Sequence, residues 1–406
     1  MDYTLIKSTT NEFISLGEGF CLNKANSIEA YRKKRKRQQR IRRVVIFMVF
    51  LIIVSILLLT NKRFQEAVGI DINPIGKSDL VEKGTGFPIE LPLSAKYSLE
   101  PMGEDIVLLT DTYVFTYSDK GRELVSSLHG YKVPALRTNS KRYLVFDEGG
   151  SELIVGGRSK EYFRKTYDEK IMLARISPDD DIAVVTDSNR YESIMIIYDK
   201  RGEEIFRWSS DEQKIIEVEF TADSNGCIVS TIGASDGQIS SKLHRFEFSE
   251  DKERWSTELI GTMVLSMNSL SDGKTAIIGD DKSAIIDKTG QVVYDQEYRL
   301  PVKCYSSMGD MTIILLDDSA NRQTIIRSFT SNGENNKEII LGDTVKSALV
   351  KDKTIFVLDE KEIIVYNANM EKVSSRDLEY DYSQLLLIDN AYYLIGAGEI
   401  AKYVEE

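Results

Sequence analysis

The sequence predicts an all-β fold, a β-propeller of eight blades, and three observations lead to this prediction. Short apolar strands separated by acidic or glycine turns recur along residues 87–406. The apolar centres of successive units lie 37 to 47 residues apart. Tight turns that end in glycine, such as Ser118–Gly121 and Asp287–Gly290, close several units. A period of about 40 residues built from short strands is typical of propeller blades, because each unit supplies one small sheet.

Eight innermost strands can be placed along the chain. Their centres are Leu99, Leu136, Ala174, Val218, Leu265, Cys304, Ala348 and Leu386. Each is followed by a second and a third strand after short turns, and in several units glycine supplies the positive φ of the turn from the third strand to the outer strand. Seven blades remain the alternative if the weak second or eighth unit is misassigned, and an open stack of sheets is a further, less economical arrangement.

The two ends of the repeat region are predicted to pair. The eighth unit ends after its third strand, whereas the strand-like segment Phe87–Leu93 precedes the first unit without a blade of its own. We expect Phe87–Leu93 to be the outer strand of the last blade, because this pairing removes the exposed sheet edges of an open array. Pro88 and Pro92 are compatible with an outer edge strand.

Charge is distributed unevenly along the chain. Residues 1–63 carry 13 Lys/Arg against 4 Asp/Glu, whereas the remaining residues carry 39 against 60. The acidic part lacks the basic footprint that nucleic acid requires, so we expect no nucleic-acid partner. The 3 Cys include no CxxC pair, which indicates neither a disulfide framework nor a cysteine metal site.

A hydrophobic segment near the N-terminus is predicted to be a transmembrane helix. Residues 44–60 contain no charged side chain, and 17 residues span about 25 Å as a helix, the short end of what crosses a bilayer. The positive-inside rule places the preceding basic run in the cytoplasm. The residues that set this orientation are Arg32, Lys33, Lys34, Arg35, Lys36, Arg37, Arg40, Arg42 and Arg43.

This segment divides the chain into a cytoplasmic tail (1–43), an uncleaved anchor (44–60), a linker (61–86) and an extracytoplasmic propeller (87–406). A cleaved signal peptide is disfavoured, because its basic region would be far too long and no small-residue cleavage site follows Leu59. The basic run could also be a nucleic-acid or nuclear-targeting patch. Its place beside a hydrophobic span favours contact with anionic lipid headgroups instead.

Several short motifs carry a resemblance to known propellers. Ile176–Asp181 and Leu270–Lys274 resemble the Ser-Pro-Asp-Gly-Lys turn of WD40-like and TolB-like repeats. Ile286–Tyr294 is similar to the docking motif of quinoprotein (PQQ-like) propellers, although Tyr294 replaces the interlocking Trp and one residue is deleted. The whole layout resembles an uncharacterised family of single-pass membrane proteins of Gram-positive bacteria with a PQQ-like/WD40-like ectodomain. That resemblance implies a surface-anchored propeller without an established ligand.

The sequence offers little for catalysis. A quinoprotein dehydrogenase would need a vicinal disulfide, and no adjacent Cys pair exists. His129 and His244 are expected to have structural roles. In the inner strands, Glu217 and Glu219 are nearly the only carboxylates. We therefore expect no enzyme activity and no cofactor.

Acidic residues recur where second strands end, and a closed ring places all these turns on one face. Turn chemistry alone accounts for Asp at such positions. A ring of like charges could also attract Ca²⁺ or a basic partner. The candidate acidic face consists of Asp111, Asp147, Asp187, Asp280, Asp317 and Asp359.

Together these patterns predict a membrane-anchored propeller that acts as a non-catalytic binding or scaffold module at the cell envelope. The expected partners are the lipid bilayer, through residues 44–60, and an envelope protein or cell-wall component. The alternative is a propeller enzyme that acts on envelope glycans or polysaccharide. The oligomeric state stays open.

Overall fold

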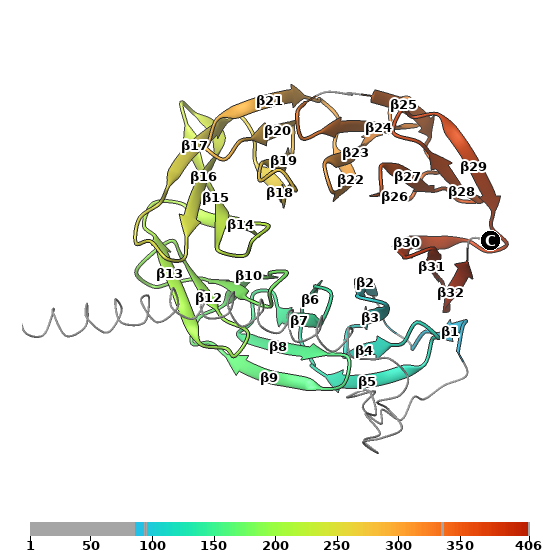
Figure 1. The fold of residues 1–406 in the computed structure, drawn as a ribbon, viewed down its shortest axis with the longest axis horizontal. Coiled ribbons are helices and arrows are strands. Elements are labelled where there is room, and N and C mark those ends of the chain that lie inside the picture. Colours follow the sequence, from blue (N-terminus) through green and yellow to red (C-terminus); the bar gives the residue numbers. More distant parts are fainter. Residues whose placement is uncertain (1–85, 93, 95, 334–336, 405–406) are drawn as a thin grey trace, which may run out of the picture. The chain divides into compact units, whose positions relative to one another are not determined.

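The computed structural model describes residues 86–406, except 93, 95, 334–336 and 405–406. Within this part, eight four-stranded antiparallel sheets are arranged around a central opening (Figure 1). The described residues include no helix that is long and apolar enough to cross a membrane. The predicted span at residues 44–60, the nine basic residues before it and nearly all of the predicted linker lie outside the described residues.

The first four blades follow one another along the chain. Blade 1 consists of β2 (Ser98–Met102), β3 (Asp105–Leu109), β4 (Tyr113–Tyr117) and β5 (Glu123–Leu128). Blade 2 consists of β6 (Pro134–Thr138), β7 (Arg142–Asp147), β8 (Glu152–Gly157) and β9 (Glu161–Thr166). Blade 3 consists of β10 (Ile171–Ile176), β11 (Ile182–Thr186), β12 (Ser193–Tyr198) and β13 (Glu204–Ser210). Blade 4 consists of β14 (Lys214–Phe220), β15 (Gly226–Ser235), β16 (Gln238–Glu247) and β17 (Trp255–Ile260).

The other four blades complete the ring. Blade 5 consists of β18 (Val264–Ser269), β19 (Thr275–Gly279), β20 (Lys282–Ile286) and β21 (Val292–Glu297). Blade 6 consists of β22 (Val302–Met308), β23 (Met311–Asp318), β24 (Gln323–Thr330) and β25 (Lys337–Gly342). Blade 7 consists of β26 (Ser347–Lys351), β27 (Thr354–Leu358), β28 (Glu362–Tyr366) and β29 (Lys372–Asp377). Blade 8 consists of β30 (Tyr382–Ile388), β31 (Ala391–Gly396), β32 (Glu399–Val404) and β1 (Ile89–Glu90).

The eight-blade prediction is therefore confirmed, and all eight predicted centres lie in innermost strands. Burial explains the sequence pattern of each blade. The second strands β3, β11 and β19 are buried along their whole length, because neighbouring blades cover both faces of the sheet. The outer strand β9 alternates between half-buried and exposed residues, since one of its faces meets solvent.

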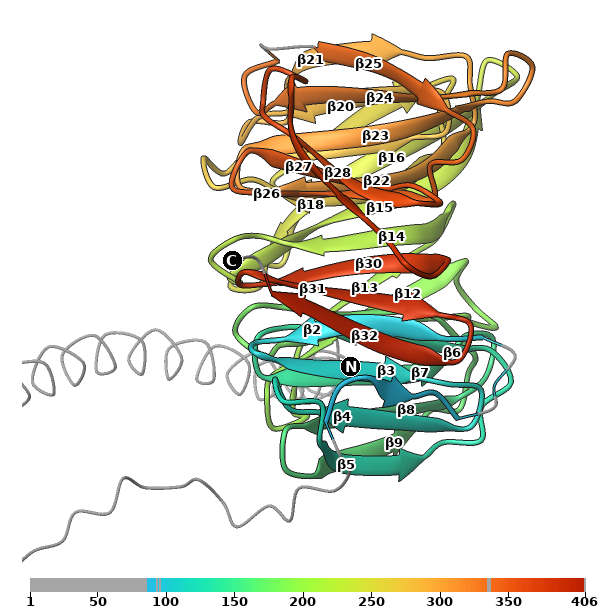
Figure 2. The same ribbon diagram turned by 90° about the vertical axis from the view of Figure 1, so that its right-hand side faces the viewer.

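The predicted closure is present, in a shorter form than expected. β1 pairs with β32 only through Ile89–Ile400 and Glu90–Glu399, and the amide of Leu91 donates to the Gly398 carbonyl at 2.9 Å. Pro88 and Pro92 lack the N–H group that a ladder needs, so they delimit the paired segment. Figure 1 shows β1 beside β32 although they come from opposite ends of the repeat region, and Figure 2 shows β30, β31 and β32 of the same sheet side by side.

Aromatic side chains on outer strands lock adjacent blades together. The Tyr294 ring on β21 lies against Gly333 of blade 6, where a Cβ would meet the ring at 2.8 Å, and 5.6 Å from the Phe329 ring. Phe87 lies against Gly121 of blade 1 in the same way, 5.4 Å from the Tyr393 ring. Both glycines have positive φ. Tyr294 therefore takes the interlocking position that the docking motif predicts.

Phe87 should contribute measurably to closure. We predict that Phe87→Ala lowers the free energy of unfolding by about 2 kcal/mol, because a half-buried ring leaves a gap between blades 8 and 1. Tyr380→Ala is the matched control, since this ring is 62% exposed and its loss should cost less than about 0.5 kcal/mol. Urea denaturation of both variants checks the difference. Deletion of Phe87–Leu93 should open the ring, which small-angle scattering would detect.

Candidate binding site in the axial channel

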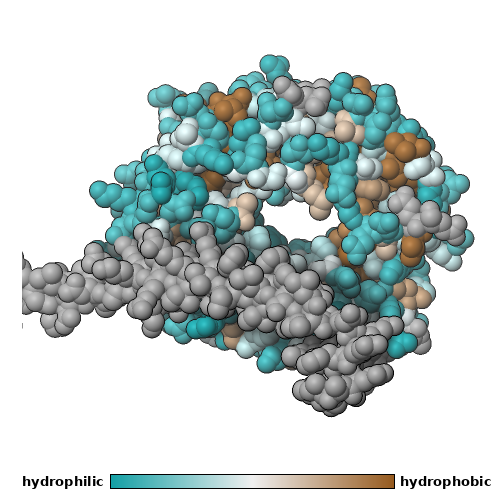
Figure 3. Space-filling model, viewed as in Figure 1, coloured by the Kyte–Doolittle hydropathy of each residue, from teal (hydrophilic) through white to brown (hydrophobic). Residues whose placement is uncertain are grey.

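The eight inner strands surround the central opening, and Figure 3 shows that side chains leave its centre empty. One half-buried residue can be taken from each inner strand. In blade order these residues are Glu100, Arg137, Arg175, Glu219, Asn268, Ser306, Leu349 and Leu386. The first four are charged and the last four are not, although Lys303 and Lys351 also lie on inner strands. The charged residues on the inner strands of blades 1 to 4 form the ionic half of the channel wall.

The ionic half is held by hydrogen bonds between blades. Thr138 of blade 2 donates its hydroxyl to Glu100 of blade 1 at 3.1 Å. The backbone N–H of Ser269 in blade 5 donates to Glu219 of blade 4 at 2.9 Å. These bonds fix the carboxylates in the wall and join each blade to the next.

An ion pair joins blades 3 and 4 at the same wall. The Arg175 guanidinium lies 2.5 Å from the Glu217 carboxylate, and their side chains are 21% and 8% exposed. The second Glu217 oxygen accepts the N–H of Val218 at 2.9 Å. Because the pair is largely shielded from water, loss of one partner would leave a charge with poor solvation.

Burial changes the proton affinity of the other carboxylates. It raises the pKa of Glu219 to about 7, with the Glu217 charge adding to the effect and the Ser269 N–H opposing it. Burial also raises the pKa of Glu100, while Arg137 and Thr138 oppose the shift. Glu219 therefore exchanges its proton near neutral pH, and the protonated form can donate a hydrogen bond into the channel.

Arg137 lies between these groups. Its guanidinium donates a hydrogen bond to the backbone carbonyl of the preceding residue, Leu136, at 2.6 Å. Burial lowers the pKa of Arg137, and the positive charge of the neighbouring Arg175 lowers it further. The carboxylates of Glu100 and Glu217 raise this pKa and so counteract the two effects. The Tyr305 hydroxyl on β22 also acts on Arg137 electrostatically. The two guanidinium groups form a cationic centre flanked by carboxylates, an arrangement suited to a ligand that carries an anionic group.

The structure shows what the six residues of the candidate acidic face contact individually. Asp147 accepts the N–H groups of Lys132 and Val133 at 3.1 and 2.9 Å. Asp280 accepts the N–H of Met263 at 2.8 Å and the hydroxyl of Thr262 at 3.1 Å. These two carboxylates bind the segment that leads into their own inner strand, as turn chemistry predicts.

The other four members have local partners as well. Asp187 lies 3.6 Å from Lys214, and Asp317 accepts the Ser319 hydroxyl at 2.8 Å. Asp111 accepts the hydroxyl of Thr112, and Asp359 the N–H of Glu360. The six residues belong to six different blades, and among the described residues no group of three or more His, Cys, Asp or Glu could hold a metal ion. The attraction of Ca²⁺ or a basic partner to this face stays a prediction.

One His forms part of a hydrogen-bonded triple that superficially resembles a catalytic triad. His244 lies 2.8 Å from Glu253 and 3.3 Å from the Thr231 hydroxyl. Thr231 is fully buried, so its hydroxyl is inaccessible to a substrate. His129 is also buried, and its ring nitrogens contact the Tyr131 N–H and the Thr110 carbonyl. Both contacts agree with the structural roles predicted for these residues.

Sequence reasoning identified Glu217 and Glu219 but missed Glu100, Arg137 and Arg175. Each missed residue is the only charged residue of its inner strand and lies within the last three residues of that strand.

The sequence matches a family of unknown function, DUF5711, over residues 89–403. The chain belongs to this family. No curated protein matches the sequence. Two solved structures are similar to the fold of this DUF5711 protein.

The first is BamB from Moraxella catarrhalis, with 12% identity, a TM-score of 0.55 and coverage of 78% of this chain and 100% of that chain. The second is quinohemoprotein alcohol dehydrogenase from Comamonas testosteroni, with 10% identity, a TM-score of 0.54 and coverage of 78% and 73%. At such identities the similarity shows the fold alone. It supports the resemblance to PQQ-like propellers and leaves activity undecided.

The perturbed carboxyl in the channel gives a pH-dependent prediction. The pKa of the Glu219 carboxyl is higher in the folded than in the unfolded protein, so the unfolded chain loses this proton first as the pH rises. The free energy of unfolding therefore falls between about pH 4.5 and pH 7. Glu219→Gln removes this penalty and keeps an acceptor for Ser269. We predict that the variant is more stable than the wild type by about 1–3 kcal/mol at pH 8 and equally stable at pH 4. Denaturation at both pH values measures this, and an equal difference at both would contradict it.

Proposed function

We propose that this protein is a membrane-anchored, extracytoplasmic propeller that acts as a non-catalytic binding or scaffold module at the cell envelope. The anchor is the uncharged segment at residues 44–60, with the basic run on its cytoplasmic side. The partner is an envelope protein or a cell-wall component, and the acidic propeller has no affinity for nucleic acid.

The single observation that carries this proposal is the ionic half of the axial channel. Charged side chains on four adjacent inner strands are costly to bury unless they are hydrogen-bonded, and Glu100, Arg175 and Glu219 are fixed by partners in neighbouring blades. Such a preorganised surface binds a charged group with little loss of side-chain entropy. Arg137 and Arg175 supply the centre for an anionic group of the partner.

Affinity capture with the tagged full chain tests the proposal. We expect the wild type to enrich a defined envelope protein or cell-wall fraction, and Arg137→Leu with Glu219→Gln to reduce its recovery at least tenfold. Arg322→Leu is the matched control, because that side chain is 82% exposed and lies outside the channel, on the turn between β23 and β24. Equal recovery with both variants, at equal thermal stability, would contradict a channel-based site.

One observation favours the alternative of a glycan-active enzyme. Glu219 exchanges its proton near neutral pH, whereas Glu217 on the same strand is held in an ion pair by Arg175. A carboxyl with a raised pKa that works with a second carboxyl is the usual arrangement of glycoside hydrolysis. A saccharide-hydrolysis screen decides between the classes. Turnover that disappears in Glu219→Gln would establish the enzyme, and absence of turnover with every envelope polysaccharide would favour the binding module.

A further inference from the structure

Five blades share a register shift at the same place between their third and outer strands. The outer-strand residue next to this shift is Val125, Phe163, Phe206, Tyr294 or Ser374, in blades 1, 2, 3, 5 and 7. Three of the five are aromatic. Blade 7 alone among them has a small polar residue at this position.

The aromatic residues fill the space toward the next blade. The Phe206 ring lies 5.6 and 5.5 Å from the rings of Phe246 and Phe248 in blade 4. Tyr294 packs on Gly333 and Phe329 of blade 6, and its hydroxyl donates to Gln296, two residues along the same strand, at 2.6 Å. This position is therefore an interlock between blades, with a polar contact at the tip of the ring.

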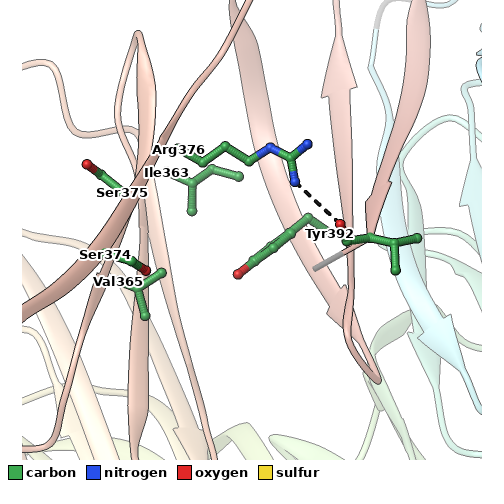
Figure 4. A pocket seen from close by; sticks show the side chains of 7 residues that line it. Ile363, Val365, Ser374, Ser375, Arg376 and Tyr392 are labelled. Carbon is green, nitrogen blue, oxygen red and sulfur yellow. Dashed lines mark hydrogen bonds between the residues drawn. The ribbon is translucent and has the colours of Figure 1, made fainter. Parts of the chain in front are cut away.

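A cavity of about 400 Å³ lies at the corresponding junction between blades 7 and 8. Ile363 and Val365 of β28, Tyr392 of β31 and Val404 of β32 line it, together with the β29 segment Ser374–Arg376 (Figure 4). All six residues of β29 are exposed. Blade 8 receives its outer strand from the start of the repeat region, so no tight turn joins β32 to that strand. The cavity therefore lies where the small Ser374 takes the place of an interlocking aromatic residue.

We propose that this cavity binds the aromatic side chain of an extended peptide from a partner protein, with an oxygen at the tip of the ring, as in tyrosine. The ring would continue the inter-blade interface that Phe163, Phe206 and Tyr294 build at other junctions. Ile363, Val365 and Tyr392 are nearly buried and form its floor. Val404 of β32, in contrast, is 59% exposed and offers apolar surface to the ring. This site is separate from the axial channel and does not depend on it.

Arg376 determines which group the tip of the bound aromatic ring must carry. Arg376 stands two residues after Ser374, as Gln296 stands after Tyr294. A guanidinium only donates hydrogen bonds, so the ring must offer an acceptor oxygen. Arg376 is already oriented, since its guanidinium lies 4.7 Å from the centre of the Tyr403 ring and donates to the Val404 carbonyl at 3.5 Å. A phenol oxygen satisfies this requirement and a phenyl ring does not.

Binding of three probes to the full chain tests the proposal by ligand-observed NMR. The probes are N-acetyl-tyrosinamide, N-acetyl-phenylalaninamide and N-acetyl-alaninamide. We expect the tyrosine probe to bind several-fold more tightly than the phenylalanine probe and the alanine probe not to bind. Ser374→Tyr fills the cavity and should weaken the tyrosine probe at least tenfold, whereas the matched Ser374→Ala leaves it open and should bind like the wild type.

A second variant keeps the test decisive if Ser374→Tyr fails to fold. Arg376→Leu should retain binding of both aromatic probes and lose the preference for tyrosine over phenylalanine. Equal binding of the tyrosine probe to the wild type and a folded Ser374→Tyr would overturn the proposal. So would absence of binding by both aromatic probes, or an unchanged tyrosine preference in Arg376→Leu.

Discussion

Pairing between β1 and β32 is the contact on which the ring depends. It joins Ile89 to Ile400, so it closes nearly the whole repeat region with two ladder pairs and one further backbone hydrogen bond. Side chains reinforce the junction between blades 8 and 1. Lys402 donates to the Asp119 carbonyl at 2.6 Å, and Gln384 donates to the Leu99 carbonyl at 3.2 Å. A few backbone hydrogen bonds are enough to close the ring because the apolar contacts of Phe87 stabilise the same junction.

Closure determines the chemistry at the axis as well as the architecture. The ionic half of the channel wall depends on contacts between the inner strands of neighbouring blades. Glu100 needs Thr138 of the next blade, and Arg175 needs Glu217. Strand exchange in blade 8 also distinguishes the junction between blades 7 and 8, since no tight turn joins β32 to its outer strand β1.

The repeat was sufficient to predict the eight inner strands and the source of the last outer strand, because apolar periodicity and turn residues are local signals. It overestimated that strand, since Pro88 and Pro92 end the ladder at Ile89–Glu90. The ionic wall was harder to predict. Glu100 precedes a two-residue turn after Met102, whereas Arg175 precedes a longer turn from Ser177 to Asp181, so the two residues do not stand at matching positions of the repeat in the sequence. The roles of Asp147 and Asp280 follow turn chemistry and needed no ligand to explain them.

Hydrogen exchange of the wild-type protein tests the central claim most directly. If the β1–β32 pairing closes the ring, the amides of β31 and β32 should be protected as strongly as those of β11 and β19 in the middle of the repeat region. They should also lose protection together with those strands in a single cooperative transition as denaturant is added. Rapid exchange of β31 and β32 under native conditions, while β11 and β19 remain protected, would contradict the account and indicate an open array of blades.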